Sequence, residues 1–471
     1  MDYSIKSFRI ARRMALLVTL TVLVAFDLHG QLPPEKAGGI DAIAGKVLAE
    51  TSAPSVSIAV VKDGKIAYVH AYGNASLDPA TPSRPEERYK IGSVSKQFMG
   101  MAILLLVQDG KLSLDDPVGR YLPTLTRASD ITIRQLLTHT SGYQDFYPLD
   151  YVAPFMTQKV TADEIIDRWA RKPLDFEPGT AWQYSNTNFV VAGKIVEKVA
   201  GTTLMAFLRE RIFRPLGMET PIDLDHEALG DSDAKGYTRF GHGPIRPVQP
   251  EAPGWLFGAG ELAMTARDLA LWDLGLIEGK LLKPALMDEM IKPVFLKNGS
   301  PTDYALGIGI SNSDGHPRLQ HGGAVSGYVS SNTVWLDQGA AVVAFSNLDG
   351  SSAPGSITRQ IGPLLLAETA DPQAAPQLEQ ARRIFSQLQG GTIDRSLLTS
   401  DANFYFTPQV LADAASSLKP LGVSESFEQT GMGLRGGMTW RSFQIKFSGG
   451  TVLRLSTFSV DDGKFAQYLI Q

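Results

Sequence analysis

The run Tyr89-Lys90-Ile91-Gly92-Ser93-Val94-Ser95-Lys96-Gln97-Phe98 leads directly into a stretch that stays almost entirely apolar up to residue 107. A surface helix keeps one polar face, whereas this stretch is apolar all round, so the sequence predicts a buried helix over 94–108. Ser93 and Lys96 stand at its start, three residues apart. Residues at this spacing share a face of a helix, so we expect the hydroxyl and the amine to point into the same space.

This pair of residues is suited to nucleophilic catalysis. A serine hydroxyl becomes a good nucleophile when a base takes its proton, and a lysine is such a base where burial lowers the pKa of its amine. The partial positive charge of the helix N-terminus lies nearby. Ser-x-x-Lys is a short pattern, however, and a second copy stands at Ser416-Ser417-Leu418-Lys419. We expect no catalytic role for the second copy. A catalytic role for the first copy is supported only if accompanying motifs are found elsewhere in the chain.

The composition indicates a well-packed globular protein. The chain has 471 residues, of which 44% are hydrophobic, and a net charge of -5. Two domains are the natural expectation at this length. The absence of a basic block argues against a nucleic-acid partner. The chain has no cysteine, so it offers no disulfide framework, no thiol nucleophile and no cysteine for lipid attachment.

Residues 1–30 have the character of an export signal. Four basic residues precede an apolar run from Met14 to Phe26, and this run is too short to span a bilayer comfortably. The sequence therefore predicts a periplasmic or secreted protein. The cleavage site matches the usual small-residue pattern only loosely, so an uncleaved segment that tethers the protein to the membrane remains an alternative.

Local patterns up to about residue 370 predict a domain of mixed helices and strands. Asp63-Gly64 between two alternating runs is a hairpin signal, and Thr132, Thr161 and Thr265 are in N-cap positions. Helices are expected over 41–51, 133–142, 162–169, 189–200, 266–276 and 357–369, and a further helix is expected after 200 that ends at about 213. Strands are expected over 55–61, 65–72, 304–310, 318–322, 328–336 and 341–346, whereas 220–255 is loop-like.

The character of the chain changes at Asp371-Pro372-Gln373-Ala374-Ala375-Pro376-Gln377, which we interpret as a linker over 371–377. The pattern beyond it predicts a small α+β domain over 378–471 with a curved antiparallel sheet. Its expected helices are 378–388 and 408–418, and its expected strands are 424–434, 438–447, 452–459 and 465–470. The main domain is accordingly expected over 31–370.

Two further motifs accompany Ser93 and Lys96, namely Tyr184-Ser185-Asn186 and His321-Gly322-Gly323. Supporting runs are Leu137-Thr138-His139-Thr140-Ser141-Gly142, Glu177-Pro178-Gly179 and Thr265-Ala266-Arg267-Asp268. In this order and spacing, the set resembles the penicillin-binding protein and class C β-lactamase superfamily of serine hydrolases. The resemblance covers about residues 40 to 370. It implies an α/β (α+β) β-lactamase/transpeptidase-like fold, with an antiparallel sheet flanked by helices plus an all-helical region. The final domain resembles, more loosely, the cone-like folds of the nuclear transport factor 2-like group.

The resemblance implies a role for each matching residue. Ser93 would be the acylated nucleophile, and Lys96 would help to take its proton. Tyr184 would be the partner base or proton shuttle, with a phenol made acidic by Lys96. Asn186 would hydrogen-bond either the substrate's carbonyl or the lysine. Tyr72-Gly73-Asn74 also fits the Tyr-x-Asn pattern, but it precedes Ser93 at the end of an expected strand, so we set it aside.

The third motif would form the wall of the site. The resemblance implies that His321 begins the strand edge that flanks the substrate, and that Gly322 and Gly323 let the substrate lie close to this strand. The oxyanion hole would be formed by the backbone N–H groups of Ser93 and Ala324. Lys-x-Gly occurs at 62–64 and 297–299 as well, but the first is an expected turn and the second a loop.

Histidine at position 321 bears on the substrate. Most true β-lactamases of this superfamily have lysine there, and histidine resembles its DD-peptidases, esterases and D-amino-acid peptidases. A histidine is mostly neutral near pH 7, so it attracts a substrate carboxylate less. We expect an exported serine hydrolase that cleaves an ester or amide (peptide) bond through a Ser93 acyl-enzyme. A β-lactamase proper and a non-catalytic relative that binds cell-wall peptides or acts as a scaffold remain alternatives.

The remaining expectations concern ligands and neighbouring residues. The partner would be a small-molecule ester, peptide or β-lactam substrate, with no cofactor, and the oligomeric state stays open. The seven histidines lack spacing such as His-Glu-x-x-His, so no metal is expected. His139 is expected as a satisfied helix-end histidine. Tyr143, Gln144 and Asp145 either line the lip of the cleft or are structural, and Trp182 either packs or touches the substrate.

Overall fold

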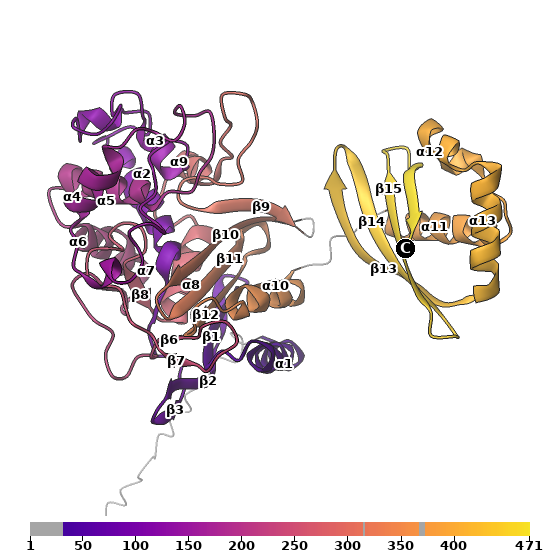
Figure 1. The fold of residues 1–471 in the computed structure, drawn as a ribbon, viewed down its shortest axis with the longest axis horizontal. Coiled ribbons are helices and arrows are strands. Elements are labelled where there is room, and N and C mark those ends of the chain that lie inside the picture. The colour runs from indigo at the N-terminus through magenta and orange to yellow at the C-terminus, as the bar shows by residue number, and fades with distance from the viewer. Residues whose placement is uncertain (1–31, 314–315, 367–372) are drawn as a thin grey trace, which may run out of the picture.

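An antiparallel sheet of seven strands organises the larger part of the computed structural model, which describes residues 32–313, 316–366 and 373–471. The order across the sheet is β3-β2-β1-β12-β11-β10-β9 (Figure 1). The strands are β1 (Ser55–Lys62), β2 (Lys65–Leu77), β3 (Ala80–Pro82), β9 (Gly309–Ser313), β10 (His316–Val325), β11 (Tyr328–Trp335) and β12 (Ala340–Ser346).

The hairpin between β1 and β2 is confirmed. Asp63 and Gly64 have φ angles of 52° and 74°, which suits a two-residue turn whose twist matches the flanking strands. Strand β2 runs on to Leu77, beyond the predicted end at Tyr72-Gly73-Asn74. The Tyr72 hydroxyl donates to Asp41 at 2.5 Å, so this Tyr-x-Asn copy faces helix α1 (Pro34–Thr51).

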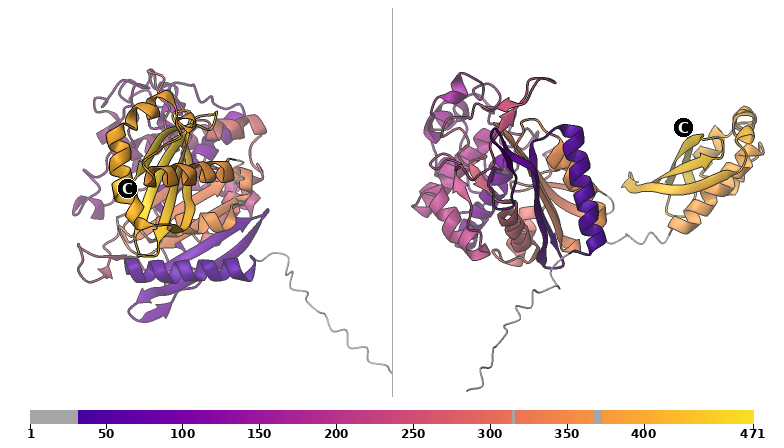
Figure 2. Two further views of the ribbon diagram at one scale, coloured as in Figure 1. Left: turned by 90° about the vertical axis from the view of Figure 1, so that its right-hand side faces the viewer. Right: turned by 90° about the horizontal axis from the view of Figure 1, so that it is seen from below.

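Helices cover both faces of this sheet (Figure 2). Helices α1 and α10 (Ala353–Leu365) pack on one face, where a hydrophobic cluster includes Ile40, Ile58, Val342 and Ile361. Alternate residues of the same strands, including Ala59 and Val343, join the cluster on the other face. The central strands are therefore buried on both sides, which explains their nearly continuous apolar sequences.

The predicted core helix is confirmed as α2 (Lys96–Gln108), whose residues from Lys96 to Leu106 are all buried. A 3₁₀ turn, η2 (Gly92–Ser95), precedes it and carries Ser93. The other helical segments on this side are η3 (Val118–Arg120), α3 (Ile133–Leu137), η4 (Phe155–Thr157), α4 (Ala162–Ile165), η5 (Ile166–Ala170), α5 (Asn186–Ala200), α6 (Leu204–Leu208), η6 (Arg209–Phe213), α7 (Arg214–Leu216), α8 (Ala266–Ile277) and α9 (Pro284–Ile291). The turn η7 (Leu336–Gln338) links β11 to β12.

Short strands connect the helical region to the sheet. They form a small sheet of order β4-β8-β5 and a two-stranded pair of β6 and β7. Their bounds are β4 (Tyr89–Lys90), β5 (Ile222–Asp223), β6 (Tyr237–Thr238), β7 (Arg246–Pro247) and β8 (Leu262–Met264). Apart from β5, β6 and β7, the segment 220–255 is irregular, as the sequence predicted.

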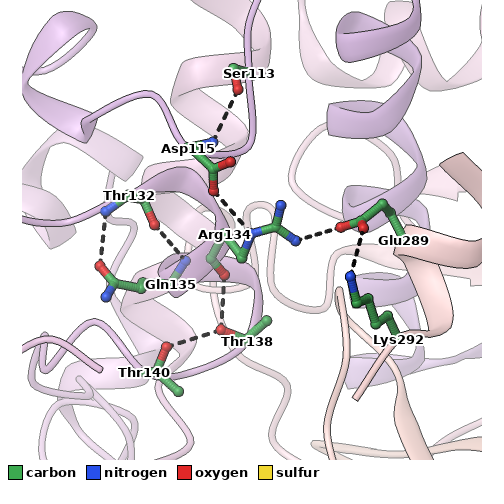
Figure 3. Close-up of polar contacts among 9 residues, drawn as sticks. All are labelled: Ser113, Asp115, Thr132, Arg134, Gln135, Thr138, Thr140, Glu289 and Lys292. Carbon is green, nitrogen blue, oxygen red and sulfur yellow. Dashed lines mark hydrogen bonds and ion pairs between the residues drawn. The ribbon is translucent and has the colours of Figure 1, made fainter. Parts of the chain in front are cut away.

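Helix α3 is held in place by a capping box and by ion pairs (Figure 3). Thr132 and Gln135 form the predicted capping box, and Arg134 bridges Asp115 and Glu289, which tethers α3 to α9. The helix ends at Leu137 rather than at Gly142. It ends early because His139 has a left-handed φ of 57°, which no α-helix continues.

One predicted strand is wrong. Residues 304–308 are irregular, and β9 begins only at Gly309. Gly307 has a φ of +80°, and a Cβ atom there would overlap the carbonyl oxygen of Lys96. This segment is therefore shaped by its packing against the start of α2, which no local pattern records.

The C-terminal segment forms a second unit with a sheet of order β13-β14-β15-β16 (Figures 1 and 2). Its hydrophobic cluster includes Phe385, Phe443 and Leu455. All four predicted strands are found, but the first helix begins at Ala374, inside the predicted linker. The elements are α11 (Ala374–Gln389), η8 (Arg395–Leu397), α12 (Ser400–Tyr405), α13 (Pro408–Leu418), η9 (Lys419–Leu421), β13 (Ser424–Arg435), β14 (Met438–Phe447), β15 (Val452–Ser459) and β16 (Phe465–Ile470).

Two expectations stay predictions. The signal segment 1–30 lies outside the described residues. Within the described ranges, no helix combines the length and apolar character needed to cross a bilayer. The resemblance of the C-terminal unit to the nuclear transport factor 2-like group also stays a prediction, although the order of helices followed by an antiparallel sheet is as expected.

Candidate active site

Ser93 and Lys96 meet at the junction of η2 and α2, as the sequence predicted. The Nζ atom of Lys96 lies 3.0 Å from Oγ of Ser93. It also donates to Oδ1 of Asn186 at 2.8 Å and to the carbonyl oxygen of Ala259 at 2.7 Å. Lys96 is 0% exposed, so its amine contacts three hydrogen-bond partners of the protein and is shielded from solvent.

The protonation state of Lys96 follows from this burial. Desolvation lowers the pKa of its amine to about 7, although Asp145 and Glu261 act in the opposite direction. A neutral amine has two N–H bonds and one lone pair. The oxygens of Asn186 and Ala259 can only accept hydrogen bonds, so the two N–H bonds point at them. The lone pair is then left facing the Ser93 hydroxyl, which is the arrangement of a general base.

Tyr184 lies on the segment that enters α5 and completes this group. Its ring centroid is 5.0 Å from Lys96 Nζ, and its phenol is close enough to the Ser93 hydroxyl for that hydroxyl to lower the phenol's pKa. Burial raises the pKa of Tyr184 well above its usual range, against a smaller lowering by Ser93. The expected acidic phenol is therefore wrong, because burial makes the charged phenolate costly and this effect dominates the pKa of Tyr184. Tyr184 retains its proton in the free protein.

Asn186 is the first residue of α5. Of the two contacts expected for it, the structure has the one with Lys96. Its backbone N–H and its Nδ2 both donate to Asp145, at 2.9 and 3.1 Å. Because Oδ1 accepts from Lys96 and Nδ2 donates to Asp145, the orientation of the Asn186 side-chain amide is fixed.

The third motif lies on β10, beside the turn that carries Ser93. Strand β9 pairs with residues 316–320 of β10, so the strand edge from His321 to Val325 has no partner on that side among the described residues. His321 thus lies within β10 and marks the start of its open edge. A Cβ atom on Gly323 would overlap the carbonyl oxygen of Ile91, and one on Gly92 would lie 3.0 Å from the Ala324 nitrogen. These close approaches explain the glycines and place the Ala324 N–H beside the Ser93 turn.

His321 is neutral, and both of its ring nitrogens form hydrogen bonds with other groups of the protein. Its Nδ1 lies 2.7 Å from the carbonyl oxygen of Gly322, which can only accept, so Nδ1 carries the proton. Its Nε2 therefore accepts from the Tyr304 hydroxyl at 2.7 Å. Burial lowers the pKa of His321 to about 4, and Lys96 acts in the same direction. His321 therefore orients the Gly322 peptide and presents no positive charge to a substrate.

Neither of two aromatic residues around these groups was assigned to the site from the sequence. Tyr304 was assigned to a strand, and no motif marks it. His139 is not the satisfied histidine expected, because its Nδ1 accepts from the Ser185 N–H at 3.1 Å while Nε2 has no hydrogen-bond partner in the described part of the chain. Its ring lies 4.2 Å from that of Tyr184 and 4.7 Å from that of Tyr304. It therefore packs behind the phenol that contacts Ser93.

A cavity of about 690 Å³ opens in front of Ser93. Tyr184, Asn186, His321, Gly322, Gly323 and Ala324 all line it. The rest of its wall combines four aromatic residues with glycine and aliphatic residues, five serines and one cation, Arg359; the aromatic residues are Phe146, Tyr147, Tyr151 and Trp255. The site is nevertheless largely apolar, with the reactive groups gathered beside the β10 edge.

The positions of the neighbouring residues bear on the alternatives that the sequence left open for them. Trp182 is 42% exposed and lines a second hollow beside His321, so it is accessible to a ligand. Tyr143 is buried with its hydroxyl on the carbonyl oxygen of Thr126, which is a structural role. Gln144 bonds the carbonyl oxygen of Pro173, and Asp145 lies behind Asn186. The second Ser-x-x-Lys copy is on α13, where the Ser416 hydroxyl bonds the carbonyl oxygen of Asp413.

Comparison with known proteins gives matches that each cover 62% or more of this chain. A family model described as beta-lactamase matches residues 40–362. Penicillin-binding protein 4* from Bacillus subtilis (strain 168) is 28% identical over 313 residues, which cover 62% of this chain and 67% of that protein. A D-aminopeptidase from Brucella anthropi is 29% identical over 304 residues, which cover 64% of this chain and 57% of that protein. The solved D-stereospecific amidohydrolase from Streptomyces sp. is 27% identical with a TM-score of 0.61, covering 72% of this chain and 100% of that one.

Proposed function

This chain belongs to the beta-lactamase family, and we propose that it is an exported serine hydrolase that cleaves an amide or ester bond through an acyl-enzyme on Ser93. One observation carries this proposal. The buried amine of Lys96 lies 3.0 Å from the Ser93 hydroxyl, with acceptors in its other two directions. Burying an ionisable amine destabilises a fold, so its presence beside a serine is the mark of a catalytic site.

In the first step, Oγ of Ser93 attacks the substrate's carbonyl carbon while Lys96 Nζ takes the hydroxyl proton. The negative charge that develops on the carbonyl oxygen is stabilised by the backbone N–H groups of Ser93 and Ala324. The Ala324 nitrogen is suited to this because the β10 edge packs against the turn that carries Ser93.

In the second step, the bond from the carbonyl carbon to the leaving nitrogen or oxygen breaks. Tyr184 donates its phenolic proton to the leaving atom and recovers a proton from Lys96, so the amine returns to its neutral form. Water then attacks the acyl-enzyme by the reverse route. Lys96 and Tyr184 carry its proton to Ser93 Oγ as the acid leaves.

The type of bond that is cleaved is proposed from the similarity of this chain to known hydrolases and from the charge of the site. The similarity to a D-aminopeptidase and a D-stereospecific amidohydrolase favours an amide or peptide bond. The neutral His321 gives little attraction for a substrate carboxylate. This disfavours efficient β-lactam turnover, which is therefore placed second to the cleavage of an ordinary amide or ester. Export rests on residues 1–30 alone.

The test is the intact mass of the protein after incubation with a fluorophosphonate and, separately, with a labelled penicillin. Ser93→Ala removes the proposed nucleophile, and Ser416→Ala is the matched control in the second Ser-x-x-Lys copy. Adducts from both reagents that vanish only in Ser93→Ala would support a peptidase or β-lactamase. A fluorophosphonate adduct alone would favour an esterase or amidase. No adduct from either reagent would contradict the enzyme assignment and favour a binding or scaffold role.

A further inference from the structure

We propose that Asp145 is a positioning residue for the Ser93 reaction, because its carboxylate fixes which end of the Asn186 amide faces Lys96. This inference deepens the proposed function and rests on it. Asp145 is outside the three motifs and does not line the cavity in front of Ser93. Its effect on the reaction would pass through Asn186 and Lys96.

Two of the three hydrogen bonds of Asp145 come from a single residue, Asn186. Its Oδ1 accepts from the backbone N–H of Asn186 at 2.9 Å, and its Oδ2 accepts from Nδ2 of Asn186 at 3.1 Å. The backbone N–H of Tyr147 donates to Oδ1 as well, at 3.3 Å. Both carboxylate oxygens are thus engaged, and Asn186 is held by its backbone and its side chain together.

The consequence for Lys96 follows from donor and acceptor rules. The two ends of an amide have nearly the same shape, so only hydrogen bonds decide its orientation. Burial raises the pKa of Asp145 to about 6, so at neutral pH and above its carboxylate is ionised and accepts only. Nδ2 of Asn186 then faces Asp145, and Oδ1 faces Lys96. With the orientation reversed, an N–H group would point at the amine and take up its lone pair. Lys96 could then no longer accept the proton of Ser93.

The fold holds Asp145 at this place from two sides. Oγ of Ser141 donates to Oδ1 of Asn188 at 2.6 Å, which ties the start of the segment to α5. Asp145 then meets the first backbone N–H of the same helix. Such a terminal N–H has no partner inside the helix, and a carboxylate is favourable there. The same contact that caps α5 therefore also sets the Asn186 side chain.

Asp145 also acts on Lys96 through its charge. It raises the pKa of the amine, as Glu261 does, whereas burial lowers it more strongly. The other titratable side chains near Lys96 come from the segment after α3, the segment before α5 and strand β10. They carry no charge near neutral pH: His139, Tyr184 and His321. Removal of the carboxylate should therefore lower the pKa of Lys96, in addition to freeing the Asn186 amide.

The experiment measures the second-order rate constant of fluorophosphonate labelling against pH in the full-length protein. In Asp145→Asn, a side-chain NH₂ faces Nδ2 of Asn186, which favours the reversed orientation. We expect the maximal labelling rate to fall at least tenfold and the acid limb of the profile to move to lower pH. If Asp145 were merely structural, its substitution would lower the labelling rate without moving the acid limb of the pH profile.

A swap variant, in which the side chains of residues 145 and 186 are exchanged, tests whether restoring the acceptor beside Lys96 restores the reaction. In Asp145→Asn with Asn186→Asp, an acceptor again faces Lys96, and position 145 supplies the matching donor. We expect at least part of the maximal rate to return, with the acid limb shifted to higher pH because the carboxylate is now beside the amine. The swap also serves where Asp145→Asn alone fails to fold.

The matched control is Asp349→Asn. Asp349 is a partly buried carboxylate whose pKa is raised by burial, and it accepts from the Gly327 N–H at 2.7 Å. We expect this variant to keep the wild-type rate and limb. If Asp145→Asn behaves like Asp349→Asn, or if the swap restores nothing, the inference is overturned. Absence of labelling in the wild type would instead overturn the proposed function, and this inference with it.

Discussion

Nζ of Lys96 lies 3.0 Å from Oγ of Ser93, and the other two contacts of this amine are with oxygens that can only accept hydrogen bonds. The serine is therefore the one partner that can give a proton to the neutral amine. Since burial brings the pKa of Lys96 to about 7, a large fraction of molecules has this base available at neutral pH. The first two predictions follow from this contact.

Lys96→Arg should slow acylation by about 10²–10⁴-fold, the usual contribution of a general base. Arginine preserves the positive charge and much of the length, but its guanidinium stays protonated in proteins and cannot accept a proton. Fluorophosphonate labelling followed by intact mass measures the loss. Lys198→Arg is the control, since this lysine of α5 only donates to the carbonyl oxygen of Tyr121. Wild-type labelling of Lys96→Arg would show that another group is the base.

The labelling rate should rise with pH through about 7 and then stay level. Below the pKa of Lys96 the amine is an ammonium without a lone pair, so the rate should fall about tenfold for each further pH unit. Burial raises the pKa of Tyr184, so the phenol keeps its proton and no alkaline limb is expected up to pH 9. Rate profiles from pH 5 to 9 check this. A rate that is constant down to pH 5, or that declines above pH 8, would contradict the assigned base.

Tyr184→Phe should separate two kinds of reaction. The variant keeps the ring against His139, 4.2 Å away, but it removes the proton proposed for the leaving group. Fluoride leaves a fluorophosphonate without a proton, whereas an amine leaving an amide requires one. We expect amide cleavage to fall by about 10²-fold or more, with a much smaller change in labelling. Equal losses in both assays would mean that Tyr184 acts on Ser93 itself.

The sequence predicted the parts of the site that local patterns encode. The buried helix after Ser93, the capping boxes at Thr132 and Thr161, and the order of the three motifs are all found in the structure. The helix and the capping boxes depend on residues close together in the chain, so propensity and spacing suffice for them, whereas the three motifs were identified by their resemblance to a known family. The turn at Asp63-Gly64 is local in the same way as the capping boxes.

The parts that were wrong or missed depend on burial and on distant packing. Tyr184 was expected to be acidic because Lys96 is near, but the desolvation of its phenol dominates. Tyr304 reaches His321 only because its segment packs against the start of α2 instead of forming a strand. Asp145 meets Asn186 across 41 residues of chain. None of these contacts leaves a period or motif in the sequence.

Deletion of residues 372–471 should leave a folded hydrolase. The C-terminal unit has its own hydrophobic cluster, which includes Ile384 and Phe465, and the site residues lie in the larger unit. We expect the shortened chain to be soluble and to be labelled at the rate of the full chain. An insoluble product would show that the two units share a core, and slower labelling would give the C-terminal unit a part in the site.

Gly323→Ala should damage the site far more than its chemical size suggests. A Cβ atom at this position would overlap the carbonyl oxygen of Ile91, and it would also press on Oγ of Ser330. The β10 edge must then move away from the Ser93 turn and take the Ala324 N–H with it. We expect a lower thermal unfolding midpoint and at least a tenfold lower labelling rate, close to the loss of one oxyanion donor.

Gly322→Ala is the matched control for folding. A Cβ atom there would have its nearest neighbour at 3.7 Å, an ordinary contact, and alanine suits a strand better than glycine does. The unfolding midpoint of this variant should therefore equal or exceed that of the wild type. If Gly323→Ala were as stable and as reactive as the wild type, the close packing of β10 on Ile91 would not position the oxyanion hole. The Ala324 N–H would then lose its proposed role.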